Sequence, residues 1–356
     1  MPKSIVAEFK VNYLQVMDEQ GNVDSKLEPQ IDNNKLIRIY TAMVLSRATD
    51  EKAIKLQRTG RMATVAPAIG QEASQVASVA AMEEEDMIFP GYRQMGAYVY
   101  RNFPTERIYL YFKGHEDGML ELKEHNIFAV NIPVGTPWIH GAGYAYAMKL
   151  KGEKKATLSY TGDGGTSEGE AYEALNFAGV FDCPAVFVVE NNQYAISTSR
   201  KNQTKAKTLA QKGIAAGIEF IQVDGNDFLA VYKAVKDARK KAVEEGIPTL
   251  IETITYRMSM HTTADDPSKY RKKEEENEWR KKDPIERAKN YLISKGIWSE
   301  EKDAKLKEET SEKVNTAATK ADELITIKSE TIFKHMFKEM PDSLKEQLEY
   351  QKRFKE

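Results

Sequence analysis

Two short motifs hold the residues best suited to chemistry. The first is Gly162-Asp163-Gly164-Gly165, and the second is Glu190-Asn191-Asn192, whose last residue lies 29 positions after Asp163. A carboxylate and an amide oxygen are ligands that a hard divalent cation such as Mg²⁺ prefers. Glycines let backbone N–H groups approach a phosphate closely. The pair therefore predicts a diphosphate site bridged by a metal ion.

The elements around these motifs place them at one edge of a sheet. A β-rich run at 156–160 leads into the glycines, a helical pattern follows at 167–180, and an apolar run at 185–189 leads into the asparagines. In a strand–turn–helix–strand unit, Asp163 and Asn192 both follow the carboxyl ends of parallel strands. Open α/β sheets bind their ligands at that edge.

Three other interpretations compete with a metal site. A dinucleotide site also uses glycines after a strand, but Asp163 within the turn would repel a diphosphate unless a cation bridged them. A nucleotide-binding P-loop is excluded because no Gly-Lys-Ser/Thr follows. Asp163 as a simple helix cap is the structural alternative. A dinucleotide-dependent oxidoreductase and a non-catalytic binding or assembly subunit therefore stay open as functions.

The composition bounds the partners and the compartment. The chain has 356 residues, of which 41% are hydrophobic and 30% charged, with a formal net charge of −2. This balance gives no reason to expect nucleic acid or an anionic membrane as a partner, and no run reaches the ~18 apolar residues of a membrane span. The single cysteine, Cys183, excludes a disulfide framework, so we expect a cytoplasmic protein with an inert core thiol.

Strands and helices alternate along most of the chain. Two more strands are predicted at 218–223 and 249–255, with a helix at 228–245 between them. This alternation predicts an α/β fold with a doubly wound, mostly parallel sheet. We divide the chain into an N-terminal extension (1–33), a central α/β domain (34–282) and a C-terminal helical extension (283–356). Further expectations are a strand at 11–17, small-residue helices at 71–82 and 141–147, loops at 113–131 and 258–279, and a helix near 332–340.

The motif pair matches the thiamine diphosphate motif, and the likeness extends beyond it. The stretches 161–178 and 190–198 resemble the α subunit of the two-subunit 2-oxo acid dehydrogenase E1 components. Similar stretches appear in the same order at 70–73, 90–93, 256–257 and 261–271. The resemblance covers about residues 35–290 and implies the thiamine diphosphate-binding fold, with thiamine diphosphate and Mg²⁺ as cofactors.

The resemblance also implies roles for individual residues. Asp163, Asn192 and the backbone carbonyl of Tyr194 would bind Mg²⁺, while the diphosphate and a water would complete an octahedron. The other residues that would contact the cofactor are Tyr92, Arg93, Val134 (through its backbone), Gly164, Gly165 and His261.

The histidines differ in what the resemblance implies for them. His261 would lie near the reacting carbon and act as an acid–base group. His115 resembles a loop histidine near the substrate entrance and is a second catalytic candidate. His125, His140 and His335 receive no role. Charged residues after His261 would order a loop around the cofactor, together with Arg257.

The reaction implied is the decarboxylation of a 2-oxo acid, followed by transfer of the acyl group to a lipoyl group on the E2 transacylase. The likeness is greatest to bacterial members that act on pyruvate; branched-chain 2-oxo acids and acetoin are the alternatives. The chain offers no convincing glutamate to activate the cofactor, and in this family that residue comes from a β subunit. We therefore expect an α2β2 heterotetramer, and an α chain that is inactive alone.

Overall fold

A six-stranded parallel sheet forms the centre of the computed structural model, which describes residues 3–325, 330–334 and 336–354. Its strand order is β1-β7-β8-β4-β3-β2. The strands are β1 (Tyr13–Leu14), β2 (Met87–Phe89), β3 (Thr157–Gly162), β4 (Ala185–Asn191), β7 (Glu219–Asp224) and β8 (Thr249–Ile254). This architecture confirms the predicted α/β fold. A separate antiparallel hairpin joins β5 (Tyr194–Ala195) to β6 (Thr198–Ser199).

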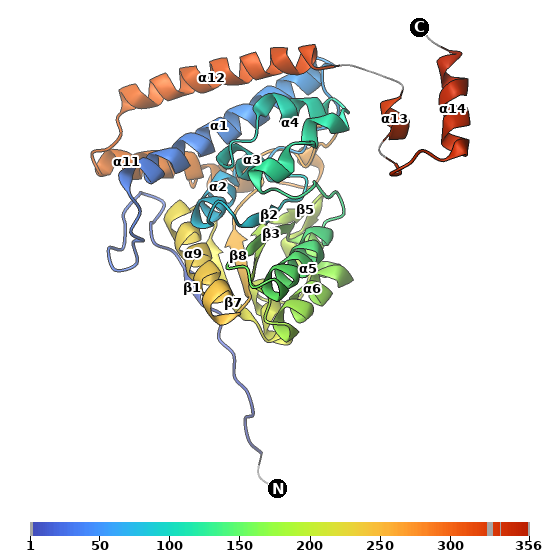
Figure 1. Cartoon of the computed structure of the whole chain (residues 1–356). Helices are drawn as coiled ribbons and strands as arrows, with labels where there is room; N and C mark the ends of the chain where they lie inside the picture. The colour runs from blue at the N-terminus through green and yellow to red at the C-terminus, as the bar shows by residue number, and fades with distance from the viewer. Residues whose placement is uncertain (1–2, 326–329, 335, 355–356) are drawn as a thin grey trace.

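Helices cover both faces of the sheet (Figure 1). α5 (Thr136–Leu150) and α6 (Gly169–Val180) lie on one face, and α2 (Glu72–Ala81) and α9 (Phe228–Glu245) lie on the other. Alternation along β4 explains this arrangement, because successive side chains point to opposite faces. Val186 and Val188 join the core beneath α2 and α9, whereas Phe187 packs against Trp138 of α5 in the second core.

Three long helices form an outer layer beyond α2. These are α1 (Asn33–Arg58), α11 (Pro284–Ser294) and α12 (Glu300–Glu323). Asp32 caps α1 by accepting a hydrogen bond from the Lys35 N–H. Asp227 caps α9 and also accepts hydrogen bonds from the backbone N–H groups of Val16 and Met17, each at 2.7 Å. One carboxylate thus ties residues 16–17 to the start of α9.

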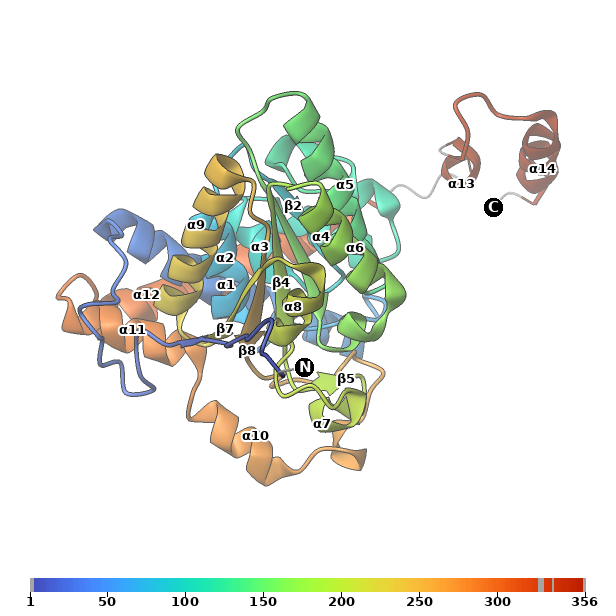
Figure 2. The same ribbon diagram turned by 90° about the horizontal axis from the view of Figure 1, so that it is seen from below.

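The remaining elements are short. The helices are α3 (Met95–Tyr100), α4 (Thr105–Phe112), α7 (Arg200–Gln203), α8 (Gly213–Ala216), α10 (Lys273–Arg280), α13 (Thr331–Lys334) and α14 (Asp342–Lys352). The 3-10 turns are η1 (Glu116–Met119), η2 (Leu122–His125), η3 (Gly164–Ser167), η4 (Ala210–Lys212) and η5 (Pro267–Lys269). α13 and α14 lie apart from the body in both views (Figures 1 and 2). Within the described ranges, no helix has the length and apolar composition needed to cross a bilayer.

Several sequence predictions need correction. The strand predicted at 11–17 is reduced to Tyr13–Leu14, which pairs only with β7 at the sheet edge. The loops predicted at 113–131 and 258–279 contain η1, η2, η5 and α10. The helix predicted near 332–340 is limited to Thr331–Lys334, followed by bends at 336–339; His335 lies outside the described residues. The domain limits at 33/34 and 282/283 stay predictions.

Candidate active site

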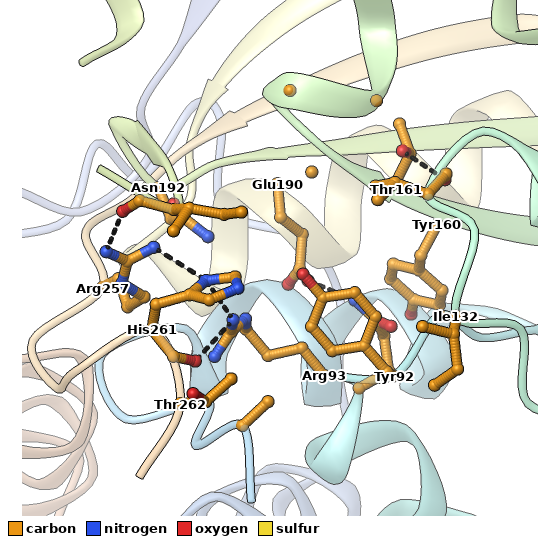
Figure 3. A pocket seen from close by; sticks show the side chains of 18 of the residues that line it. Tyr92, Arg93, Ile132, Tyr160, Thr161, Glu190, Asn192, Arg257, His261 and Thr262 are labelled. Atoms are coloured by element: carbon orange, nitrogen blue, oxygen red, sulfur yellow. Dashed lines mark hydrogen bonds between the residues drawn. The ribbon is translucent and has the colours of Figure 1, made fainter. Parts of the chain in front are cut away.

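A cavity of about 830 Å³ lies beyond the carboxyl ends of β3 and β4. The two strands are in register at Gly162 and Glu190, so Asp163 and Asn192 leave neighbouring strands at the same edge. The cavity is lined by nine of the residues predicted from the sequence: Tyr92, Arg93, Val134, Asp163, Gly164, Gly165, Asn192, Tyr194 and His261. His115 is not in the lining, although Gly114 and Glu116 beside it are. Figure 3 shows several of these side chains around the cavity.

Asp163 follows β3 directly and is 1% exposed. Its Oδ2 accepts a hydrogen bond of 2.5 Å from Nε2 of Gln203, which lies at the end of α7. Burial raises the pKa of Asp163, and the Gln203 hydrogen bond opposes this rise. A buried carboxylate is stabilised when a cation takes up its charge, so the position of Asp163 fits a metal ligand.

Asn192 and Tyr194 offer two further oxygen atoms nearby. The Asn192 amide nitrogen donates to Oε1 of Gln71 at 3.0 Å, and its Oδ1 accepts from the Tyr194 N–H at 3.4 Å. The Tyr194 carbonyl accepts from Nη1 of Arg257 at 3.1 Å. Carboxylate, amide and carbonyl oxygens form a donor set that suits Mg²⁺. No cluster of three His, Cys, Asp or Glu side chains in the described residues could hold a metal, so such an ion would also need oxygens from its ligand.

Gly164 and Gly165 of the glycine turn leave no room for side chains. A Cβ at Gly165 would lie 2.1 Å from Thr161 Oγ1 and 2.8 Å from Val134 Cγ1, and one at Gly164 would lie 2.6 Å from the Ala195 Cβ. The Thr161 hydroxyl donates to the Val134 carbonyl at 2.7 Å, which holds the Val134 loop against the turn. Backbone is therefore exposed to the cavity where a phosphate would need N–H donors.

Two buried arginines supply positive charge to the cavity wall. Arg93 is 7% exposed and Arg257 is 1% exposed. Arg93 donates to the Pro67 carbonyl and to His261, while Arg257 donates to the carbonyls of Tyr194 and Ile196. Neither guanidinium forms an ion pair with any described residue. Burial and the charge of Arg93 lower the pKa of Arg257. Two buried cations that have no ion-pair partner among the described residues fit an anionic ligand.

His261 lies between these arginines (Figure 3). Its Nδ1 is 3.0 Å from Arg93 Nη2 and 3.3 Å from Arg257 Nη1. Guanidinium nitrogens only donate, so Nδ1 accepts and the ring proton sits on Nε2. Burial, followed by the charges of Arg93 and Arg257, lowers the pKa of His261 to about 4. The ring is therefore neutral at pH 7.

The chain around His261 is fixed by its neighbours. The His261 N–H donates to Asp265 Oδ2 at 2.7 Å, and the Tyr270 hydroxyl donates to the same carboxylate. That hydroxyl also accepts from Arg257 Nη2 at 2.8 Å. The charged cluster seen in the sequence thus forms one network, in which Tyr270 connects Arg257 to Asp265.

Sequence reasoning missed three residues at the site. Arg257 was assigned to a charged loop, although it follows β8 by three positions and so lies at the ligand-binding edge. Gln71 stood in a motif that carried the resemblance but received no role. Gln203 had no signal, because its contact with Asp163 depends on how α7 folds back over the glycine turn.

One side of the cavity is open and is lined by exposed apolar residues. Ile132 and Ile196 line it, yet they are 59% and 58% exposed. Ile196 also has a φ of +54°, a left-handed conformation that β-branched residues rarely adopt. Small-molecule sites usually bury most of their ligand's surface, and on this side the described residues leave the cavity open to solvent.

Comparison with known proteins gives consistent matches. The family model described as "Dehydrogenase E1 component" matches residues 40–329. The pyruvate dehydrogenase E1 component subunit alpha of Bacillus cereus is 46% identical over 352 residues, covering 98% of this chain and 94% of the relative. The protein of the same name from Acholeplasma laidlawii is 46% identical over 342 residues, covering 95% and 99%. That of Staphylococcus aureus strain N315 is 43% identical over 345 residues, covering 96% and 93%.

Proposed function

Because this chain belongs to the dehydrogenase E1 component family, we propose that it is the α subunit of a pyruvate dehydrogenase E1 component, an oxidoreductase acting on 2-oxo acids. One observation carries the proposal beyond the family. A single cavity contains both hard oxygen ligands and two arginines. These arginines have no ion-pair partner among the described residues. An anionic cofactor bound through a metal would require this combination. The choice of pyruvate rests on relatives with that name that match nearly the whole chain.

Thiamine diphosphate is the cofactor on which this family depends, and the cavity fits its diphosphate and a cation. Asp163, Asn192 and the Tyr194 carbonyl would hold Mg²⁺. Other residues would hold the diphosphate or meet the aminopyrimidine: the backbone N–H groups of Gly164 and Gly165, the side chains of Tyr92 and Arg93, and the backbone of Val134. Arginine suits this task because its planar fork donates two hydrogen bonds at once. When bound, the cofactor supplies the electron sink that lets a 2-oxo acid lose CO₂.

The protein's own groups position this chemistry. Burial together with Arg93 and Arg257 keeps His261 neutral, with its proton on Nε2, so in the free chain the ring can donate a hydrogen bond from Nε2 to a developing negative charge. An anion bound between the arginines would offset their charge and raise the pKa of His261. We assign His261 as the catalytic acid–base group, and His115 as a second candidate on the loop beside the cavity.

The assembly we propose is an α2β2 heterotetramer that passes the acetyl group to the lipoyl domain of E2. The exposed Ile132 and Ile196 at the cavity's open side support a β subunit there. We also propose a cytoplasmic location, where the single buried thiol of Cys183 would stay reduced. Nucleic acid and membrane are not among the partners we propose.

Reconstitution with the β subunit tests this proposal. The complex should turn over pyruvate faster than 2-oxoisovalerate or acetoin, and the α chain alone should turn over none of them. Asp163→Ala should abolish Mg²⁺-dependent binding of thiamine diphosphate and activity together, because the one carboxylate of the proposed ligand set is lost. Binding of NAD that does not depend on Mg²⁺ would instead favour a dinucleotide-dependent oxidoreductase, and cofactor binding without turnover a non-catalytic subunit.

A further inference from the structure

Two glutamines hold the two side chains that we assign as metal ligands. Gln203 contacts Asp163, and Gln71 contacts Asn192. We propose that Gln203 and Gln71 are positioning residues of the metal site, which fix the directions in which these two ligands present their oxygens. The inference rests on the proposed function, since it presumes that the site binds a divalent cation.

The hydrogen bonds leave only one orientation for each amide of the Gln71 pair. Gln71 Nε2 lies 3.4 Å from the Ala68 carbonyl, which can only accept, so Gln71 Oε1 is the atom directed at Asn192. Because Gln71 Oε1 can only accept, the Asn192 atom facing it must be the amide nitrogen, which donates. The Asn192 side-chain oxygen then faces the Tyr194 N–H. Gln71 is fully buried and lines the cavity. It therefore sets which Asn192 atom is available to a cation.

Gln203 acts on Asp163 by the same logic. Its Nε2 donates to the Thr198 carbonyl at 3.0 Å and to Asp163 Oδ2 at 2.5 Å. Thr198 belongs to the β5–β6 hairpin, which also contains the Tyr194 carbonyl. One amide thus connects the only carboxylate of the ligand set to the segment that supplies the backbone ligand.

The hydrogen bonding of the Gln203 amide indicates that this side chain orients Asp163 and does not only fill space. Gln203 Oε1 is buried and has no hydrogen-bond partner in the described residues. Among the described residues, the Gln203 amide therefore makes its hydrogen bonds through Nε2, to Asp163 and to the Thr198 carbonyl. The partners of metal ligands generally orient those ligands, and their loss typically weakens metal affinity by about 10- to 100-fold.

The test measures metal binding directly. Mn²⁺ would replace Mg²⁺ in the reconstituted α–β enzyme with thiamine diphosphate, and free and bound Mn²⁺ would be separated by electron paramagnetic resonance. Gln203→Met and Gln71→Met keep the side-chain length but remove the polar contact, so each should weaken Mn²⁺ binding by about 10- to 100-fold. Gln203→Lys should weaken it further, because an ammonium beside Asp163 competes with the cation.

A matched control and a kinetic measurement separate positioning from general damage. Gln211→Met, on η4, removes an amide whose oxygen accepts a hydrogen bond from the Thr208 N–H and contacts neither proposed metal ligand among the described hydrogen bonds, so it should leave Mn²⁺ affinity unchanged. Raising the metal concentration should restore kcat of Gln203→Met to within about twofold of the parent, because the ligands themselves remain.

Two results would overturn the inference while the proposed function stands. These are wild-type Mn²⁺ affinity in Gln203→Met and Gln71→Met, or a loss of kcat that no metal concentration restores. If the unmodified complex binds thiamine diphosphate without any divalent cation, the proposed metal site itself fails. The two failures are therefore distinguishable.

Discussion

At the scale of single residues, His261 shows how burial and the charges of neighbouring residues together set the protonation of a side chain. Two guanidinium groups point at the same ring nitrogen, and no described carboxylate contacts the ring itself; Asp265 accepts from the backbone N–H instead. A second proton would have to enter beside two positive charges in a half-buried position. The free chain therefore keeps a neutral imidazole, with one fixed tautomer, in the cavity wall.

This arrangement predicts that His261 does not titrate between pH 5 and 8 in the free chain. Its pKa of about 4 lies below that range, so the ring stays neutral throughout. Arg93→Met removes one of the two charges and should raise the pKa of His261 by about 1 unit or more toward its ordinary value. Imidazole ¹⁵N chemical shifts recorded against pH measure both quantities, and loss of the signal in His261→Asn assigns it.

The same spectra contain the control. Arg38→Met removes an arginine that contacts Tyr100. Arg38 does not line the cavity, and it is not among the charged groups that shift the pKa of His261. It should leave the titration of His261 unchanged. A His261 signal that titrates near pH 6.5 in the parent chain would show that the arginines do not hold the ring as described.

At the scale of elements, the β3–η3 turn contains two glycines, Gly162 and Gly165, with different surroundings. A Cβ at Gly165 would collide with Thr161 and Val134, whereas a Cβ at Gly162 would meet no atom within 4 Å. Gly165→Ala must push the Val134 loop away, so it should lower the free energy of unfolding by about 1–3 kcal/mol. Denaturation of the α chain by urea measures this loss.

Gly162→Ala is the matched control for that change. It adds the same methyl group three positions earlier, at the end of β3, where space is open. Its effect on the free energy of unfolding should stay within about 0.5 kcal/mol. Equal losses in the two variants would mean that the contact between the turn and the Val134 loop is not what makes Gly165 necessary.

The elements also show what sequence patterns can and cannot predict. β3 and β4 were predicted to within two residues, because their buried runs end at turn residues on both sides. The strand predicted at 11–17 was too long, since β1 has one partner and a partly exposed face. Nine predicted site residues line the cavity, as the motifs implied. Gln203 was not predicted, because α7 meets Asp163 only through the tertiary fold.

At the scale of the whole molecule, the proposed site shared with a β subunit rests on the open side of the cavity. The cavity is bounded by the sheet edge, the glycine turn and the loops of Arg93 and His261, but Ile132 and Ile196 remain exposed along its open side. Apolar side chains exposed at a functional cavity mark a surface that another molecule covers.

A substitution at Ile196 should affect the stability of the isolated α chain and its assembly with the β subunit in different ways. Its left-handed backbone costs roughly 1–2 kcal/mol in a β-branched residue, and its exposed side chain contributes little burial in the isolated chain. Ile196→Gly should therefore leave the α chain equally stable, or more stable by up to about 1 kcal/mol, because glycine adopts this conformation without strain. The same change should weaken assembly with the β subunit, since it removes an apolar contact at the shared site.

Thermal unfolding of the α chain and sedimentation of the α–β mixture measure the two effects separately. Ile5→Gly is the control, because Ile5 is 83% exposed and is not part of the cavity, so its loss should affect neither measurement. If Ile196→Gly assembles as tightly as the parent, then the strained residue does not face the β subunit. A clear loss of stability in the isolated chain would show instead that Ile196 is held by contacts within α. Only the combination of retained stability and weakened assembly fits a residue whose strain is compensated by the partner.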